Sequence, residues 1–134
     1  MLTDDERKEL LQAAKEAQQD AYVPYSKYRV GAALLTEAGK LYQGANIENA
    51  AYPVSICAER VAVFKAVSEG EKEFKGIAVV TRDGGSPCGS CRQVIAEFGL
   101  ETIILIANEA GEVVAESSVG DLLPGAFGPS NLLD

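Results

Sequence analysis

The sequence predicts an α/β fold in which helices cover a mixed sheet. One observation is the succession of an apolar strand, a helix and a second apolar strand across residues 75–108, which implies a parallel pair. Another is that short glycine-containing turns join other strand-like segments, which implies antiparallel pairs. With 134 residues the chain has room for one core, so a single domain over residues 1–134 is expected.

The first half of the chain predicts a helix followed by a hairpin. A helix over 4–21 is expected because Thr3 or Asp4 can cap a segment whose apolar residues recur at helical spacing. The strand-like segments 28–36 and 41–48 are joined by the turn Glu-Ala-Gly-Lys, which predicts an antiparallel hairpin.

The second half predicts alternating helices and strands. A helix over 57–69 is expected, with Val61, Phe64 and Val67 on its apolar face. The elements expected after it are a strand over 75–82, a helix over 87–99 opened by Pro87, a strand over 101–108, and a turn with a strand over 109–117. The tail, 119–134, is rich in Gly and Pro yet apolar, so we expect it to pack against something, such as a neighbouring chain.

Composition and charge narrow the function classes. The net charge of −8, with no cluster of Lys and Arg larger than a pair, argues against binding a nucleic acid polymer. No window is apolar enough for a membrane span, and the acidic start of the chain lacks the features of a signal peptide. A cytoplasmic protein with reduced thiols is therefore expected.

Three cysteines and the absence of histidine point to a metal site with an open position. Cys57, Cys88 and Cys91 each fall at an expected helix N-terminus, where the helix dipole favours the thiolate. Zinc prefers thiolate ligands and can join a Cys-x-x-Cys turn to a distant third ligand. A closed structural site needs four ligands, so three thiolates without histidine predict a catalytic zinc ion with a position left for water.

Charged neighbours of the cysteines are candidates for the chemistry. Three thiolates make the zinc unit formally negative, and Arg60 on the same helix face as Cys57 is expected to offset this charge. Arg92 is the alternative donor and is expected to face solvent. Glu59 can reach a water molecule on the metal and shuttle its proton, although an acidic residue in a first helical turn is also common for the dipole alone. A redox Cys-x-x-Cys pair or three inert thiols remain alternatives, but neither explains Cys57 together with Glu59.

Five ordered motifs carry a resemblance to a known family. "PYSKYRVGAAL", "GANIENAAYP", "CAER", "PCGSCRQ" and "LLPGAF" together resemble the small homotetrameric zinc-dependent cytidine deaminases over nearly the whole chain. The resemblance implies a three-layer α/β/α fold with about five strands, one Zn²⁺ per chain held by the three cysteines, and active sites shared between subunits. It implies hydrolysis of cytidine or deoxycytidine with release of ammonia in pyrimidine salvage, zinc-bound hydroxide attacking C4 while Glu59 moves the protons.

The resemblance also assigns residues to the substrate. It places the Ala58 backbone N–H in the base pocket and Asn46 with Glu48 on the ribose hydroxyls; these two residues, two apart on an extended segment, are expected to face the same way. Tyr28 stands where the family commonly has Phe, a departure that keeps an aromatic wall and adds a hydroxyl. The remaining assignments are Phe127 and Tyr52 at contacts between subunits, and Gln93 with Arg60 around the ligands.

Three other functions are weighed against this one. A deaminase of a cytosine-nucleoside antibiotic, of the blasticidin type, would share the zinc motifs but differ in the sugar and tail contacts. A polynucleotide-editing deaminase is opposed by the acidic charge and the all-cysteine triad. A noncatalytic zinc or redox module would retain zinc without turning over any cytosine compound.

Overall fold

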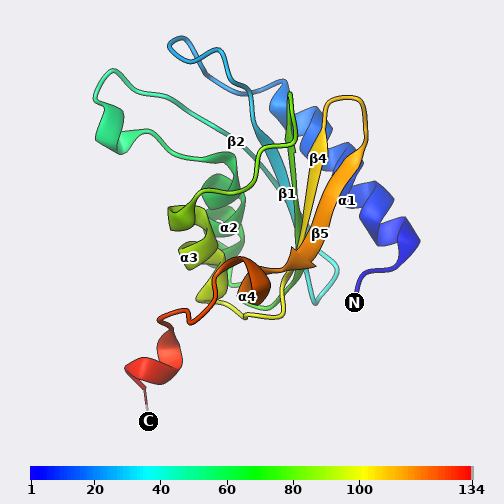
Figure 1. Ribbon diagram of the computed structural model, residues 1–134, viewed down its shortest axis with the longest axis vertical. Helices are drawn as coiled ribbons and strands as arrows, with labels where there is room; N and C mark the ends of the chain where they lie inside the picture. The colour runs from blue at the N-terminus through cyan, green and yellow to red at the C-terminus, as the bar shows by residue number, and fades with distance from the viewer. Residues whose placement is uncertain (134) are drawn as a thin grey trace.

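The computed structural model describes residues 1–133, which form a five-stranded sheet with helices on both faces (Figure 1). The strands lie in the order β2-β1-β3-β4-β5. The elements are α1 (Asp4–Gln18), β1 (Gly31–Thr36), β2 (Leu41–Ala45), the 3-10 turn η1 (Tyr52–Val54), α2 (Ala58–Ser68), β3 (Phe74–Thr81), α3 (Gly89–Ala96), β4 (Ile103–Asn108), β5 (Val113–Ser118), α4 (Val119–Leu122) and the 3-10 turn η2 (Pro129–Asn131).

The strand directions bring α2 and α3 to the same edge of the sheet. β1 is antiparallel to β2 and to β3, so β2 and β3 run in the same direction. α2 follows β2 and α3 follows β3, and both helices therefore begin beyond the carboxyl ends of these strands. β3 and β4 are parallel, and β4 and β5 antiparallel. The predicted mixed sheet, both hairpins and the parallel pair are confirmed.

The core divides into two layers because successive side chains of a strand point to opposite faces. In β1, Ala32 and Leu34 belong to the cluster that includes the buried residues of α2 and α3, whereas Ala33 and Leu35 belong to the cluster on the α1 side. Figure 1 shows α1 on one face of the sheet and α2 with α3 on the other. The three-layer arrangement is thus confirmed.

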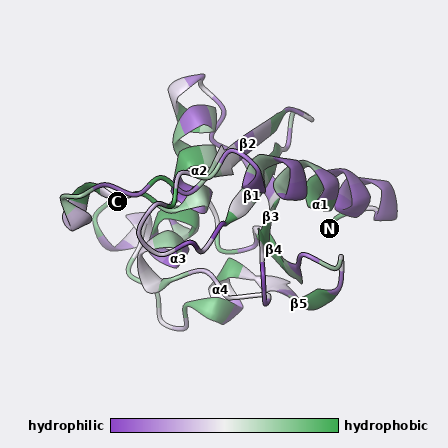
Figure 2. Ribbon diagram, turned by 90° about the horizontal axis from the view of Figure 1, so that it is seen from above, coloured by the Kyte–Doolittle hydropathy of each residue, from purple (hydrophilic) through white to green (hydrophobic). Residues whose placement is uncertain are grey.

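Helix α1 begins where the sequence predicts and ends earlier. Thr3 is its N-cap and forms a capping box: its Oγ1 accepts from Glu6 N at 3.1 Å, and its N donates to Glu6 Oε1 at 2.9 Å. Most of the surface of α1 is hydrophilic, because only one stripe of the helix packs against the sheet and the rest faces outward (Figure 2). The helix stops at Gln18 rather than at residue 21 because the chain turns there, and Tyr22 N donates to Asn46 O.

In residues 1–133 there is no helix with the length and apolar character that a membrane span requires.

The predicted apolar face of α2 is correct for Val67, which packs partly buried against the core, and wrong for Phe64, which is 47% exposed. The hydrophobic residues that the helix buries are Ala58, Ala62, Val63 and Ala66. Alanine is frequent on the contact face because the helix lies very close to the sheet.

Gly44 in β2 marks the point of closest approach between α2 and the sheet. A Cβ atom at this position would lie 2.6 Å from Ala62 N and would also overlap Ala58 O. Both atoms are helix backbone and have no rotamer through which to move away. The absence of a side chain at Gly44 therefore sets how closely the first turn of α2, which follows Cys57, lies on the sheet.

We predict that Gly44→Ala lowers the free energy of unfolding by about 1–3 kcal/mol, because overpacking against backbone forces the helix outward. The same shift is expected to weaken zinc retention. Urea unfolding and metal analysis measure the two effects. Gly128→Ala is the matched control, since nothing lies within 4 Å of its would-be Cβ. Unchanged stability and metal content in Gly44→Ala would contradict this description of the helix contact.

Candidate active site

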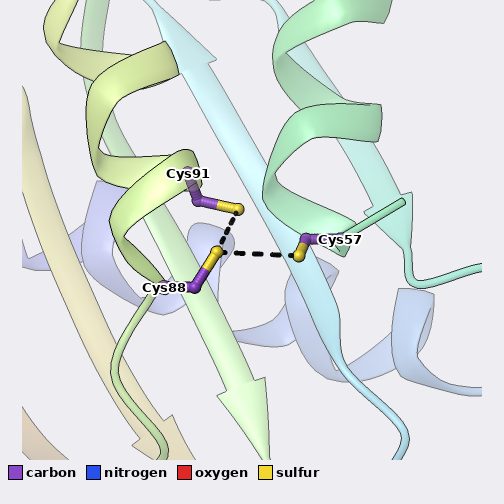
Figure 3. Close-up of side chains that lie close together, drawn as sticks. All are labelled: Cys57, Cys88 and Cys91. Carbon is purple, nitrogen blue, oxygen red and sulfur yellow. Dashed lines mark hydrogen bonds between the residues drawn. The ribbon is translucent and has the colours of Figure 1, made fainter. Parts of the chain in front are cut away.

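Three thiols from two helix N-termini meet at one point. Cys57 is the N-cap residue of α2, Cys88 is the N-cap residue of α3, and Cys91 lies in the first turn of α3. The Sγ atoms of Cys57 and Cys88 are 3.9 Å apart, and those of Cys88 and Cys91 are 3.5 Å apart (Figure 3). The predicted convergence of the three cysteines is confirmed.

The thiol geometry fits a zinc ion. Tetrahedral zinc with Zn–S bonds of about 2.3 Å separates its sulfur ligands by about 3.8 Å, close to both of these distances. All three ligand atoms lie within 4.8 Å of one another. Cys91 is buried and Cys57 partly buried, whereas Cys88 is exposed. The cluster is therefore positioned to bind one metal ion.

Arg60 provides positive charge beside the thiols, as predicted. Its Nη2 donates to Cys57 Sγ at 3.5 Å, and its own pKa is raised chiefly by this hydrogen bond. The hydrogen bond with Cys91 and the Arg60 guanidinium lower the pKa of Cys57 to about 5. Conversely, the interaction with Cys57 and burial raise the pKa of Cys91. In the described part of the chain, Arg60 Nε is buried without a hydrogen-bond partner.

Glu59 carries a buried carboxyl group beside the thiols. The residue is 4% exposed, and burial raises its pKa above the ordinary value. It lines the cleft together with Cys57 and Cys88. Because burial raises its pKa, this carboxyl group binds a proton more readily than an exposed one, and it can carry a proton beside the thiols.

The prediction that Arg92 faces solvent is wrong. Its Nε donates to Pro87 O at 2.9 Å, its Nη1 to Leu122 O at 2.7 Å, and its Nη2 to Ser86 Oγ at 2.8 Å. The guanidinium therefore joins the segment before Cys88 to the end of α4. It donates to two backbone carbonyl oxygens and one hydroxyl, and these bonds hold the loop that leads into Cys88.

The cleft lined by Cys57 and Cys88 has a volume of about 430 Å³ and is large enough for a small molecule. It brings together most of the residues that the sequence singled out. Those that line it are Tyr28, Asn46, Glu48, Cys57, Glu59, Arg60 and Cys88. Val30, Ile56 and Val79 contribute apolar walls that the sequence analysis did not identify.

Asn46 and Glu48 both line the cleft, at the end of β2. Asn46 Oδ1 accepts from Val30 N at 2.9 Å and its Nδ2 donates to Tyr28 O at 2.9 Å. Glu48 Oε1 accepts from the backbone N atoms of Tyr25 and Ser26 at 3.0 and 3.1 Å, and hydrogen bonding to Ser26 holds the pKa of this carboxyl below its usual value. Glu48 is therefore ionised at neutral pH.

Tyr28 lines the cleft and is held by a residue that the sequence analysis missed. Its hydroxyl donates to Asp83 Oδ1 at 2.6 Å. Asp83 belongs to the turn Asp-Gly-Gly directly after β3, which composition marks as a loop. The partner of Tyr28 lies 55 positions away in the sequence, and no local pattern connects the two.

Five predicted site residues do not line this cleft, and one of them is Cys91, which is buried within the thiol cluster. Tyr52, 73% exposed, packs edge-on against Tyr25, and Phe127 is 58% exposed. Gln93 is not brought to the ligands, because its Nε2 donates to Phe127 O at 2.7 Å. Ala58 is buried at the first position of α2, where a backbone N–H has no acceptor within the helix.

Comparisons with known proteins agree with this geometry. The sequence model of the cytidine and deoxycytidylate deaminase zinc-binding region matches residues 4–107. A cytidine deaminase of Sporosarcina psychrophila is 52% identical over 126 residues, which cover 92% of each chain. A crystal structure of cytidine deaminase from Burkholderia pseudomallei superposes with a TM-score of 0.86 at 46% identity, covering 94% of this chain and 100% of the other.

A relative with another substrate is more distant. Blasticidin-S deaminase of Bacillus cereus is 31% identical over 109 residues, which cover 74% of this chain and 76% of that protein. The thiol cluster lies within the region that the family model matches. The chain belongs to the cytidine and deoxycytidylate deaminase family and contains its zinc-binding region.

Proposed function

We propose that this protein is a zinc-dependent cytidine deaminase. It hydrolyses cytidine and deoxycytidine: water adds at C4 of the pyrimidine, the bond from C4 to the exocyclic nitrogen breaks, and uridine or deoxyuridine leaves with ammonia. The observation that carries the proposal is a cleft lined by two thiols of the metal-binding cluster, by the buried carboxyl group of Glu59 and by the Asn46 and Glu48 side chains; the buried thiol of Cys91 completes the cluster. A cytoplasmic enzyme of pyrimidine salvage fits free thiols in a reducing compartment.

The protein residues divide the work of proton transfer and charge balance. Zinc held by the three cysteines lowers the pKa of water, so that a nucleophile is available near neutral pH. Glu59 takes a proton from that water, donates to N3 of the pyrimidine, and delivers the second proton to the departing amine. Arg60 offsets the charge of the thiolates through its hydrogen bond to Cys57.

Other residues orient the nucleoside. The free backbone N–H of Ala58 donates to the base, and Tyr28 forms an aromatic wall beside it. Asn46 and Glu48 bind the sugar hydroxyls: Glu48 Oε1 is occupied by two backbone N–H groups, which leaves its second oxygen for the substrate. Binding the sugar at one end of the cleft holds C4 near the thiols at the other.

The blasticidin-type alternative rests on the distant Bacillus cereus relative. Higher identity to proteins named cytidine deaminase favours the plain nucleoside. A noncatalytic zinc module would need no buried carboxyl group beside the thiols. Turnover of cytidine, of the antibiotic, or of neither separates the three functions.

We predict that zinc-loaded protein converts cytidine to uridine, followed by the ultraviolet change of the base and by ammonia in the same sample. Glu59→Ala is expected to keep one zinc per chain and to lose at least about 10²–10⁴-fold in kcat, because it removes proton transfer and no ligand. Glu9→Ala, an exposed change on α1, serves as the control. Loss of zinc from Glu59→Ala, or near-normal turnover by it, would contradict the assigned role.

A homotetramer with shared active sites is part of the proposal. The loop that carries Tyr52 and the C-terminal segment that carries Phe127 both extend away from the sheet (Figure 1). Their large apolar side chains are exposed, including Leu132 at 77% and Leu133 at 70%. Exposed apolar segments of this kind are typical of contacts between subunits. Phe127 and Tyr52 then reach the active site of a neighbouring chain.

Mixing variants tests whether sites are shared. We predict that wild-type protein sediments as four chains and that Phe127→Ala lowers activity in every subunit. When Phe127→Ala chains are unfolded and refolded with Glu59→Ala chains, activity is expected to rise above that of either variant, because mixed assemblies contain sites with both residues intact. A fully active monomer, or no rise on mixing, would overturn the shared site.

A further inference from the structure

The Tyr28 ring is enclosed by the loop after β3. Its hydroxyl donates to Asp83 Oδ1 at 2.6 Å, and the guanidinium carbon of Arg82 lies 5.3 Å from the ring centroid. A Cβ atom at Gly85 would lie 2.7 Å from the same hydroxyl oxygen, so the loop backbone closes directly over it. One segment thus contacts the phenol at its face and at its hydroxyl.

The loop itself is rigidly attached to the sheet and to the metal ligands. Thr81 Oγ1, at the end of β3, accepts from Gly84 N at 2.9 Å and from Gly85 N at 2.8 Å. The next residues, Ser86 and Pro87, are held by Arg92 and lead into Cys88. A contact with this loop is therefore a contact with the segment that positions a zinc ligand.

The backbone of Tyr28 is anchored on the opposite side. Asn46 Nδ2 donates to its carbonyl oxygen, and Asn46 also binds Val30 N. Asp83 does not line the cleft, whereas Tyr28 does. Asp83 therefore contacts the wall of the cleft through the Tyr28 hydroxyl.

We infer that Asp83 is a positioning residue for substrate, which fixes the Tyr28 ring as a wall of the cleft at a set distance from the metal ligands. The phenol hydroxyl forms the link. A ring held at its face and at its hydroxyl loses little freedom when a planar base packs against it, so the bond favours binding of a pyrimidine. The hydrogen bond also lowers the pKa of Asp83 while burial raises that of Tyr28, so at neutral pH a phenol donates to a carboxylate.

A double-mutant cycle on cytidine tests the role. We expect Tyr28→Phe and Asp83→Ala each to raise KM about 2- to 10-fold with kcat nearly unchanged, and the double variant to be no worse than either single change. Tyr22→Phe and Asp20→Ala, exposed changes outside the cleft, are the matched controls. A rise in KM for Tyr28→Phe without one for Asp83→Ala would overturn the inference, as would additive effects.

A second variant uses the close approach of Gly85. Gly85→Ala is expected to raise KM in the wild-type background, because the added methyl group displaces the Tyr28 hydroxyl. In the Tyr28→Phe background the same change meets no hydroxyl, and its effect is expected to be much smaller. Equal effects in both backgrounds would contradict the enclosure of the hydroxyl by the loop.

A spectroscopic readout separates this inference from the proposed function on which it rests. The chain has five tyrosines and no tryptophan, so its near-ultraviolet absorption reports on tyrosine. We expect Asp83→Ala, which removes the acceptor, to shift the tyrosine absorption to shorter wavelength in the wild-type background and to leave it unchanged in Tyr28→Phe. Inactivity of all forms on cytidine with this shift present would reject the substrate and keep the bond. Absence of the shift would reject the bond itself.

Discussion

The active site depends on the meeting of two helix N-termini at one edge of the sheet. β2 and β3 run in the same direction on either side of β1, so α2 and α3 begin side by side. Gly44 lets the backbone of α2 lie almost directly on β2, which sets the position of its first turn. This arrangement brings the cysteines of two short sequence motifs together in one three-sulfur cluster. It also places Glu59 and Arg60 beside the cluster, because they lie in the same helical turn as Cys57.

Electrostatics and burial complement each other in this turn. Three thiolates concentrate negative charge, and the two helix N-termini with the Arg60 guanidinium supply the opposite sign. Glu59 is buried beside them, which opposes its ionisation. The segment 25–30 is hydrogen-bonded to Asn46 and Glu48, so the residues proposed to bind the sugar also hold the aromatic wall in place.

The sequence predicted what local spacing encodes. Cys57, Cys88 and Cys91 were identifiable because helix start signals and ligand spacing coincide, and the parallel pair followed from the strand, helix, strand order. The buried face of α2 was not predictable, because close packing selects alanine where a count of hydrophobic residues selects Phe64. The backbone contacts of Arg92 and the Asp83 partner of Tyr28 depend on loops brought together by the fold. Two points stay predictions. One is the single domain over residues 1–134, and the other is the set of roles assigned to the substrate residues.

Three thiolates are expected to bind one zinc ion and to leave one coordination position for a light atom. X-ray absorption at the zinc edge on the purified, zinc-loaded protein measures this directly. We predict three sulfur neighbours at about 2.3 Å and one oxygen or nitrogen neighbour at about 2.0–2.2 Å, with one zinc per chain. Four sulfur neighbours, or two sulfur neighbours with the rest light atoms, would contradict it, since the first describes a closed structural site and the second removes a cysteine from the metal.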